Sequence, residues 1–126
     1  EDSLRNVVDF QIAKGAHGLT ILGVLGEGQK LTDAEREVVI NTVLEQVNGR
    51  IPVVVTTSHQ STSIVIERAK QAEAAGAAGV MIAPPVLLRG LDAVRGFYQA
   101  VAKPVPIPNV LQDEPRATDV ILPASF

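Results

Sequence analysis

The segment best suited to bind a ligand is a run of six residues, Gly23 to Gly28, that contains three glycines. It follows the apolar residues 19–22 and precedes a helix signal that begins at Thr32. Glycine has no Cβ, so the main chain can turn here and its N–H groups can approach a ligand closely. Because α/β folds place their sites after the carboxyl ends of strands, we expect this loop to bind a ligand. A tight turn required only by packing stays open as the alternative.

Other polar residues are weaker candidates. Gln112 follows a strand candidate, so it could face the ligand or hydrogen-bond its own loop, and both interpretations stay open. Glu27 could be a general base, but we expect it to cap a helix or accept hydrogen bonds from loop N–H groups. We expect His17 at the surface, because it precedes a strand. His59 follows a strand beside Ser58, but no second ligand group stands at useful spacing, so we expect no metal site.

Hydrophobic spacing predicts the elements that would position these residues. Apolar residues at helical spacing indicate helices at about 3–14, 32–48, 62–75 and 91–101. Apolar runs indicate strands at 18–22, 51–55, 79–83 and 105–111, and the second reads as buried on both faces. Strands that alternate with helices through short loops give a parallel sheet. The sequence therefore predicts an α/β fold of four helix–strand pairs.

Local signals refine this prediction. Ser3 is expected to cap the first helix, and Thr32 with Glu35 to form a capping box on the second. Tyr98 and Met81 are expected in the core. The last strand candidate contains three alternating prolines at 104, 106 and 108. Proline cannot donate to a sheet ladder, so we expect this strand at an edge.

Composition excludes several classes of function. The net charge of the 126 residues is −3 and no basic cluster is present, so we expect no nucleic-acid partner. No apolar run is long enough for a membrane span. The absence of cysteine excludes thiolate chemistry, and with no signal-peptide pattern at the N-terminus we expect a cytoplasmic location. The glycine spacing fits neither nucleotide motif, so we expect no cofactor.

The motifs, in this order and spacing along nearly the whole chain, resemble the dihydrodipicolinate synthase / N-acetylneuraminate lyase family. They are Gly23-x-x-Gly26-Glu27, Leu31-Thr32-x-x-Glu35-Arg36, Gly49-Arg50-Ile51-Pro52-Val53, Ser61-Thr62, Ala72-x-x-x-Gly76-Ala77, Pro84-Pro85 and Gln112-Asp113-x-Pro115. The resemblance implies a (β/α)₈ barrel. It also implies a class I aldolase that forms a Schiff base between a lysine and pyruvate or a related 2-keto acid.

The resemblance implies a substrate site with few hydroxyl groups. The family's Gly-Thr-Thr-Gly-Glu motif becomes Gly23-Val24-Leu25-Gly26-Glu27 here. The N–H groups of Val24, Leu25 and Gly26 would still hold the keto-acid carboxylate, but both threonine hydroxyls are absent. The family's acid/base tyrosine falls at Gln112, which cannot exchange protons near neutral pH. A further tyrosine pair falls at Val86 and Leu87.

The Schiff-base lysine of the family does not match any lysine of this chain. In the family it lies on a later strand, which would follow Phe126. The lysines present are Lys14, Lys30, Lys70 and Lys103, and we expect all four on solvated helices or loops. We therefore assign no catalytic residue with confidence within residues 1–126.

Length indicates an incomplete barrel. A complete barrel takes ~250 residues, so residues 1–126 would form one incomplete TIM-barrel domain with roughly strands 2–5 and their helices. Open strand edges invite pairing with another chain, and we expect a homo-oligomer. Two alternatives to a fragment of the keto-acid enzyme stay open. One is a catalytically inactive half barrel that self-associates, and the other is a different barrel enzyme that binds a phosphorylated small molecule.

Overall fold

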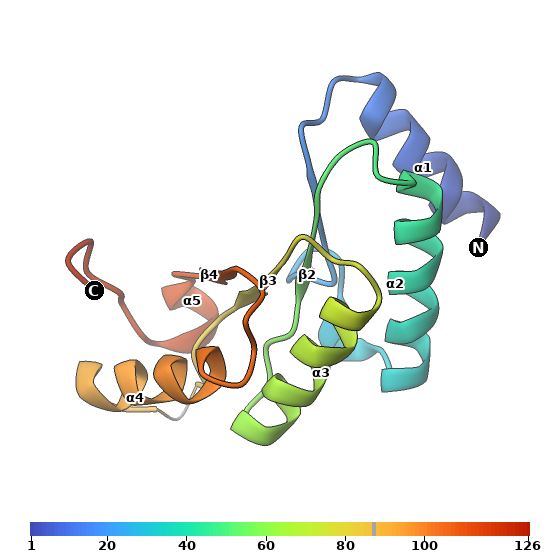
Figure 1. Ribbon diagram of the computed structural model, residues 1–126. Coiled ribbons are helices and arrows are strands. Elements are labelled where there is room, and N and C mark those ends of the chain that lie inside the picture. Colours follow the sequence, from blue (N-terminus) through green and yellow to red (C-terminus); the bar gives the residue numbers. More distant parts are fainter. Residues whose placement is uncertain (87) are drawn as a thin grey trace.

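A four-stranded parallel sheet forms the centre of the computed structural model, which describes residues 1–86 and 88–126. Its strands are β1 (Leu19–Ile21), β2 (Val53–Thr56), β3 (Gly79–Ile82) and β4 (Asn109–Leu111). They pair in the order β1-β2-β3-β4, all parallel, which is also their order along the chain (Figure 1). The predicted parallel α/β fold is confirmed, and it corresponds to part of a TIM barrel.

Each strand is preceded by a helix on the chain. The helices are α1 (Asp2–Ala13), the short 3₁₀ helix η1 (Gly28–Lys30), α2 (Asp33–Val47), α3 (Thr62–Ala74), α4 (Leu91–Ala102) and α5 (Pro115–Thr118). Helices α1 and α2 lie side by side, as Figure 1 shows. The expected cap of the first helix was wrong, because Glu1 rather than Ser3 occupies the N-cap position. No helix in the described ranges combines the length and apolar character that crossing a membrane requires.

The two faces of the sheet differ in burial. Val55 of β2 pairs with Val80 of β3, and both are fully buried on the face that the helices cover. On the other face, Val54 and Met81 are only half-buried, and Val110 is 46% exposed. The expectation that β2 is buried on both faces and that Met81 is in the core was therefore wrong. The reason is that the described residues place no second layer over this face.

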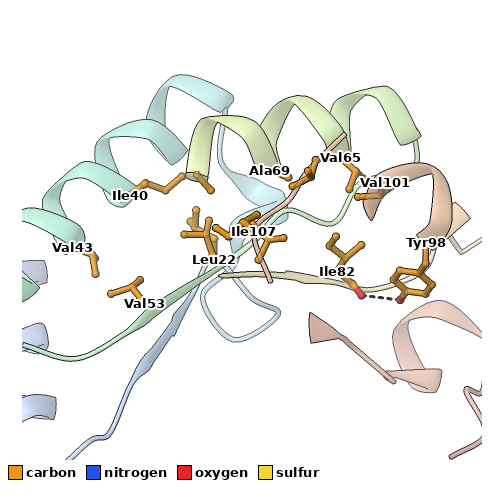
Figure 2. Close-up of a cluster of buried hydrophobic side chains, with 14 of the residues drawn as sticks. Leu22, Ile40, Val43, Val53, Val65, Ala69, Ile82, Tyr98, Val101 and Ile107 are labelled. Carbon is orange, nitrogen blue, oxygen red and sulfur yellow. Dashed lines mark hydrogen bonds between the residues drawn. The ribbon is translucent and has the colours of Figure 1, made fainter. Parts of the chain in front are cut away.

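Helices α2, α3 and α4 supply the other half of the core. Figure 2 shows Ile40, Val65 and Val101 from these helices facing Val53 and Ile82 of the sheet. Small residues on α3 bring it close to the strands, since Ala69 and Ala72 have no exposed surface. This packing holds the carboxyl ends of the strands in fixed positions, which is what a site at that edge requires.

The last strand begins later than the sequence indicated. β4 covers only Asn109–Leu111, so the prolines at 104, 106 and 108 all precede it. Pro108 still contributes its carbonyl oxygen, which accepts a hydrogen bond from the N–H of Val80 at 2.9 Å. The strand lies at the edge of the sheet, as expected. Proline has no N–H to donate, and this explains why regular pairing starts only after the third one.

The capping box at the start of α2 is present as predicted. The Thr32 hydroxyl accepts from the Glu35 N–H at 3.3 Å, and the Glu35 carboxylate accepts from the Thr32 N–H at 2.8 Å. The N–H and then the hydroxyl of Thr32, which both donate to the Glu35 carboxylate at 2.8 Å, hold the pKa of Glu35 below its usual value. The box fixes the point at which the chain leaves the glycine loop.

Replacing Thr32 with alanine should therefore lower the free energy of unfolding by about 1 kcal/mol. The loss arises because one main-chain N–H at the start of α2 loses its acceptor. Urea unfolding followed by circular dichroism measures it. Ser61→Ala is the matched control, because Ser61 occupies the N-cap of α3 without a side-chain capping hydrogen bond. An equal loss in both variants would contradict the role of the box.

Tyr98 is in the core as expected, and its hydroxyl is satisfied there. The side chain is 7% exposed, and its hydroxyl donates to the Ile82 carbonyl oxygen at 2.8 Å (Figure 2). Burial, and then the charge of Asp113, raise the pKa of Tyr98 above its usual value. The neutral phenol is therefore favoured in the folded protein.

This raised pKa predicts alkaline destabilisation. The folded protein keeps the Tyr98 proton to a higher pH than the unfolded chain does. The contribution of Tyr98 to the free energy of unfolding should therefore be constant below about pH 10 and fall as pH rises beyond it. Tyr98→Phe should cost about 1 kcal/mol at neutral pH, and its deficit should shrink above the ordinary tyrosine pKa. Urea unfolding across this range measures both effects. A deficit that stays constant with pH would contradict the assignment.

Candidate functional site

A cavity of about 280 Å³ lies at the carboxyl ends of the strands. Loops that follow β1, β2, β3 and β4 all contribute to its lining. Its lining includes Gly23, Val24, Gly28, Arg36, Thr56, Ser58, His59, Gln60, Arg68, Val86, Gln112 and Glu114. This is the edge at which parallel α/β folds bind ligands, so the cavity is the candidate site.

The glycine loop forms one wall of this cavity. Gly23 and Val24 line it, whereas Leu25 and Gly26 do not, and the Leu25 side chain is 99% exposed. The loop closes on itself through hydrogen bonds from Glu27 N–H to Val24 O and from Gly28 N–H to Gly23 O. Within the described chain, the N–H groups of residues 24, 25 and 26 have no hydrogen-bond acceptor. Three successive main-chain donors in one turn are suited to an anionic ligand, and of these three residues Val24 lines the cavity.

The glycines of this loop serve a different purpose from the one the sequence suggested. The left-handed positions of the turn are Leu22, with φ 60°, and Glu27, with φ 50°, and neither is glycine. At Gly28 space is the constraint, because an added Cβ would lie 2.2 Å from the Leu22 carbonyl oxygen. Close approach of the main chain, rather than positive φ, therefore requires glycine here.

Gln112 also reaches the cavity, from the end of β4. Its main-chain N–H donates to the Ile82 carbonyl oxygen at 2.9 Å, so its backbone continues the ladder between β3 and β4. The side chain is half-buried, and its amide makes no hydrogen bond with other described residues. The structure thus brings Gly23, Val24 and Gln112 to one cavity. Their expected roles in binding a substrate stay predictions.

Residues after β2 form another wall, and each uses its polar group within the loops. Ser58 Oγ accepts from Ala83 N–H at 2.8 Å, and His59 Nδ1 accepts from Ser61 N–H at 3.0 Å. Gln60 Oε1 accepts from Val86 N–H at 3.0 Å. Ser58 and His59 therefore do not form a catalytic pair. Leu87, the second position of the expected tyrosine pair, lies outside the described residues.

Glu27, His17 and the lysines lie away from the site. Glu27 occupies the N-cap position of η1, but its carboxylate makes no capping hydrogen bond and pairs with the Lys30 ammonium, so the expected hydrogen bonds to loop N–H groups were wrong. His17 is exposed, as expected. None of the four lysines lines the cavity. In the described part of the chain, no three acidic or imidazole groups come together as metal ligands would.

Two arginines of the site were missed by reasoning from the sequence. Arg36 of α2 is 4% exposed, and Arg68 of α3 has a side chain that is 15% exposed. Both line the cavity. A charged residue on a helix normally reads as a solvated surface group. The only sequence feature that singled out Arg36 was its place after Glu35 in the motif shared with the family. That place does not indicate whether the side chain is buried.

Arg36 connects the glycine loop to the central strand. Its Nη1 donates to the Gly28 carbonyl oxygen at 3.0 Å, and its Nη2 donates to the Thr56 carbonyl oxygen at 2.6 Å. Burial, and then the charge of Arg68, lower the pKa of Arg36, while Asp33 acts in the opposite direction. The guanidinium is therefore buried chiefly against carbonyl groups.

Comparison with known proteins assigns the chain to a family. A family model described as the dihydrodipicolinate synthetase family matches residues 1–125. Similar curated relatives include an L-2-keto-3-deoxyarabonate dehydratase of Azospirillum brasilense, 42% identical over 128 residues. A 4-hydroxy-tetrahydrodipicolinate synthase of Sorangium cellulosum is 44% identical over 124 residues. Each alignment covers 98% of this chain but only 41% of the relative, so the chain spans about two fifths of their length.

Solved structures show the same fold. A crystal structure of dihydrodipicolinate synthase matches with a TM-score of 0.92 and 31% identity, over 96% of this chain and 42% of that chain. A prophage protein of the dihydrodipicolinic acid synthase family from E. coli K12, in complex with pyruvate, matches with a TM-score of 0.88 and 28% identity, over 94% and 40%. The cavity described above thus lies in a fold shared with a protein that was solved with a keto acid.

Proposed function

The chain belongs to the dihydrodipicolinate synthetase family, and from this premise we propose that it forms the carboxylate-binding part of an enzyme that acts on pyruvate or a related 2-keto acid. Residues 1–126 would be a single, incomplete TIM-barrel domain that supplies one side of the active site. The reacting lysine, which forms a Schiff base with the keto group, would come from outside these residues. This assignment places the chemistry among class I aldolase-type lyases.

The observation that carries the proposal is the run of free main-chain donors in the glycine loop, whose first residue, Val24, lines the cavity. The N–H groups of Val24, Leu25 and Gly26 would bind the carboxylate of the keto acid. Gln112 would orient the substrate from the opposite wall, because its free side-chain amide can both donate and accept. None of the four lysines lines the cavity, which agrees with a proposed imine on a lysine outside residues 1–126.

Beyond the keto acid itself, the substrate is proposed to be unlike aspartate semialdehyde. Val24, Leu25 and Gln112 provide none of the hydroxyl groups that the family's proton relay uses, so an altered relay should accompany an altered substrate. The 42% identity to an L-2-keto-3-deoxyarabonate dehydratase supports a keto acid that loses water. A 4-hydroxy-tetrahydrodipicolinate synthase is equally similar, at 44% identity, so identity alone does not separate the two reactions.

Borohydride trapping tests the proposal. A protein that carries this chain at the length of its relatives should form a covalent adduct when it is reduced with borohydride in the presence of pyruvate. Intact mass and peptide mapping should place the adduct on one lysine outside residues 1–126. No adduct, or an adduct spread over Lys14, Lys30, Lys70 and Lys103, would refute it. Reduction without pyruvate is the control.

Self-association without turnover is a second candidate that a specific observation favours. The uncovered face of the sheet and its β4 edge expose Val110 at 46% and Leu111 at 42%. An open apolar edge of this kind favours pairing with another chain. Sedimentation equilibrium of residues 1–126 alone tests this candidate. A monomer at all concentrations would refute it.

A further inference from the structure

We propose that Arg36 is a positioning residue for the glycine loop and that its charge draws the carboxylate of the ligand to that loop. The proposal rests on the function proposed above and names a residue that its binding site requires. Arg36 does not need to touch the substrate. It acts by holding the main-chain donors in place and by supplying a positive potential behind them.

The geometry of the guanidinium supports the positioning role. One side chain donates to Gly28, at the end of the loop, and to Thr56, at the end of β2. Arginine has a planar fork of fixed shape, so two simultaneous bonds set the distance between the two carbonyl groups. Gly28 is in turn packed directly on Leu22, where the loop leaves β1. Arg36 thereby fixes both ends of the loop relative to the sheet.

The charges around Arg36 support the electrostatic role. Among the described residues, the only carboxylate paired with Arg36 is Asp33, at 4.0 Å from Nε, and that carboxylate is already bound by Arg68 at 2.9 and 2.7 Å. Two arginines thus share one acid, which leaves one net positive charge in the cluster. The cavity lining also holds one carboxylate, Glu114, which pairs with neither arginine, so the net positive charge belongs to the cluster of Arg36, Arg68 and Asp33 and not to the cavity as a whole. A buried cation with incomplete neutralisation attracts an anion strongly, because screening by water is weak there.

The test varies the charge of the cluster and the charge of the ligand independently. The full-length protein is titrated with pyruvate and with pyruvamide, a neutral analogue, and the half-saturating concentration for borohydride adduct formation is measured for each. Asp33→Asn removes the shared acid, so pyruvate should bind roughly three- to tenfold more tightly, while pyruvamide should be unaffected. Stability should fall slightly at the same time, because Arg68 loses its partner. A purely structural role predicts weaker binding, not tighter.

Asp9→Asn is the matched control for the change of net charge. Asp9 also pairs with an arginine, Arg50, but it belongs to α1, where it also contacts Gln46 of α2, and it does not line the cavity. Neither ligand should respond to this substitution. An equal gain in pyruvate affinity from both variants would overturn the electrostatic role.

Arg36→Lys tests the positioning role. Lysine keeps the charge but has no planar fork, so it cannot bond both carbonyl groups in the same way. Both ligands should bind roughly tenfold more weakly, since misplaced N–H donors affect a carboxylate and an amide alike. Unchanged affinity for both would overturn it. If this variant fails to fold, the Asp33→Asn result still decides the electrostatic role.

An absent adduct in the unsubstituted protein would refute the proposed function itself, and the inference with it.

Discussion

Replacing Gly28 with alanine should lower the free energy of unfolding by about 3 kcal/mol and abolish high-affinity binding at the glycine loop. The added Cβ would lie 2.2 Å from the Leu22 carbonyl oxygen and 2.9 Å from its carbon, and both are main-chain atoms that cannot rotate away. The loop must therefore move, and Arg36 loses the Gly28 carbonyl that it binds. Urea unfolding and pyruvate trapping measure the two losses.

Gly96→Ala is the control for this prediction. Gly96 lies within α4, and a Cβ there would meet nothing within 4 Å. Alanine is the better helix former, so this variant should be more stable than the unsubstituted protein by up to about 1 kcal/mol. Opposite signs for the two glycine substitutions would establish close packing as the cause. A loss of similar size in both would contradict it.

Replacing Ile82 with alanine should lower the free energy of unfolding by about 2–5 kcal/mol. Ile82 has no exposed surface and lies between β3 and α4 beside Tyr98 (Figure 2). Its removal would leave a cavity under the helix that supports β3. Its main-chain carbonyl accepts from both Tyr98 and Gln112, so Gln112 should shift as well. Chemical unfolding measures the loss of stability. The proton chemical shifts of Tyr98, which donates to the same carbonyl oxygen as Gln112, report the displacement at that carbonyl.

Ile121→Ala provides a control of the same residue type. Ile121 is 72% exposed, so its truncation should change stability by less than about 0.5 kcal/mol. If the Ile82 variant were no less stable than the Ile121 variant, the core described here would be wrong.

The positions of the family's hydroxyl relay carry no hydroxyl groups here, and this has a mechanistic consequence. Val24 and Gln112 both line the cavity, and neither side chain can relay a proton at neutral pH. Two buried hydroxyls close to this region, those of Thr56 and Thr57, have no hydrogen-bond partner among the described residues. Proton transfer in the proposed reaction must therefore use groups other than the Gly-Thr-Thr-Gly relay of the family.

Most of the secondary structure was predictable because it depends on local chemistry. Helical spacing placed Val65, Ala69 and Ala72 on one buried face, and all three have no exposed surface. The capping box at Thr32 needs only residues that are neighbours in the sequence. The four-strand parallel order followed from the alternation of elements and their short connections. The resemblance to the family likewise depended on motifs that are read along the chain.

The errors involve contacts between segments far apart in the sequence. Met81 read as core because its strand is apolar, but burial depends on what covers each face of the sheet. Arg36 was noticed only as part of a motif, and its burial against carbonyl groups eight and twenty residues away was not predicted. The glycines of the loop were expected to let the main chain turn. Gly28 is instead required because the Leu22 carbonyl oxygen leaves no space for a Cβ.

The sequence alone therefore determined the order of the elements, their parallel pairing and the placement of a glycine loop after the first strand. Each of these is encoded in the spacing of neighbouring residues. Only the tertiary structure decided which residues share the cavity and where an incompletely neutralised charge lies. Those properties arise when α2 and α3 pack on the sheet and bring Arg36 and Arg68 to the same carboxylate, a convergence that linear spacing does not record.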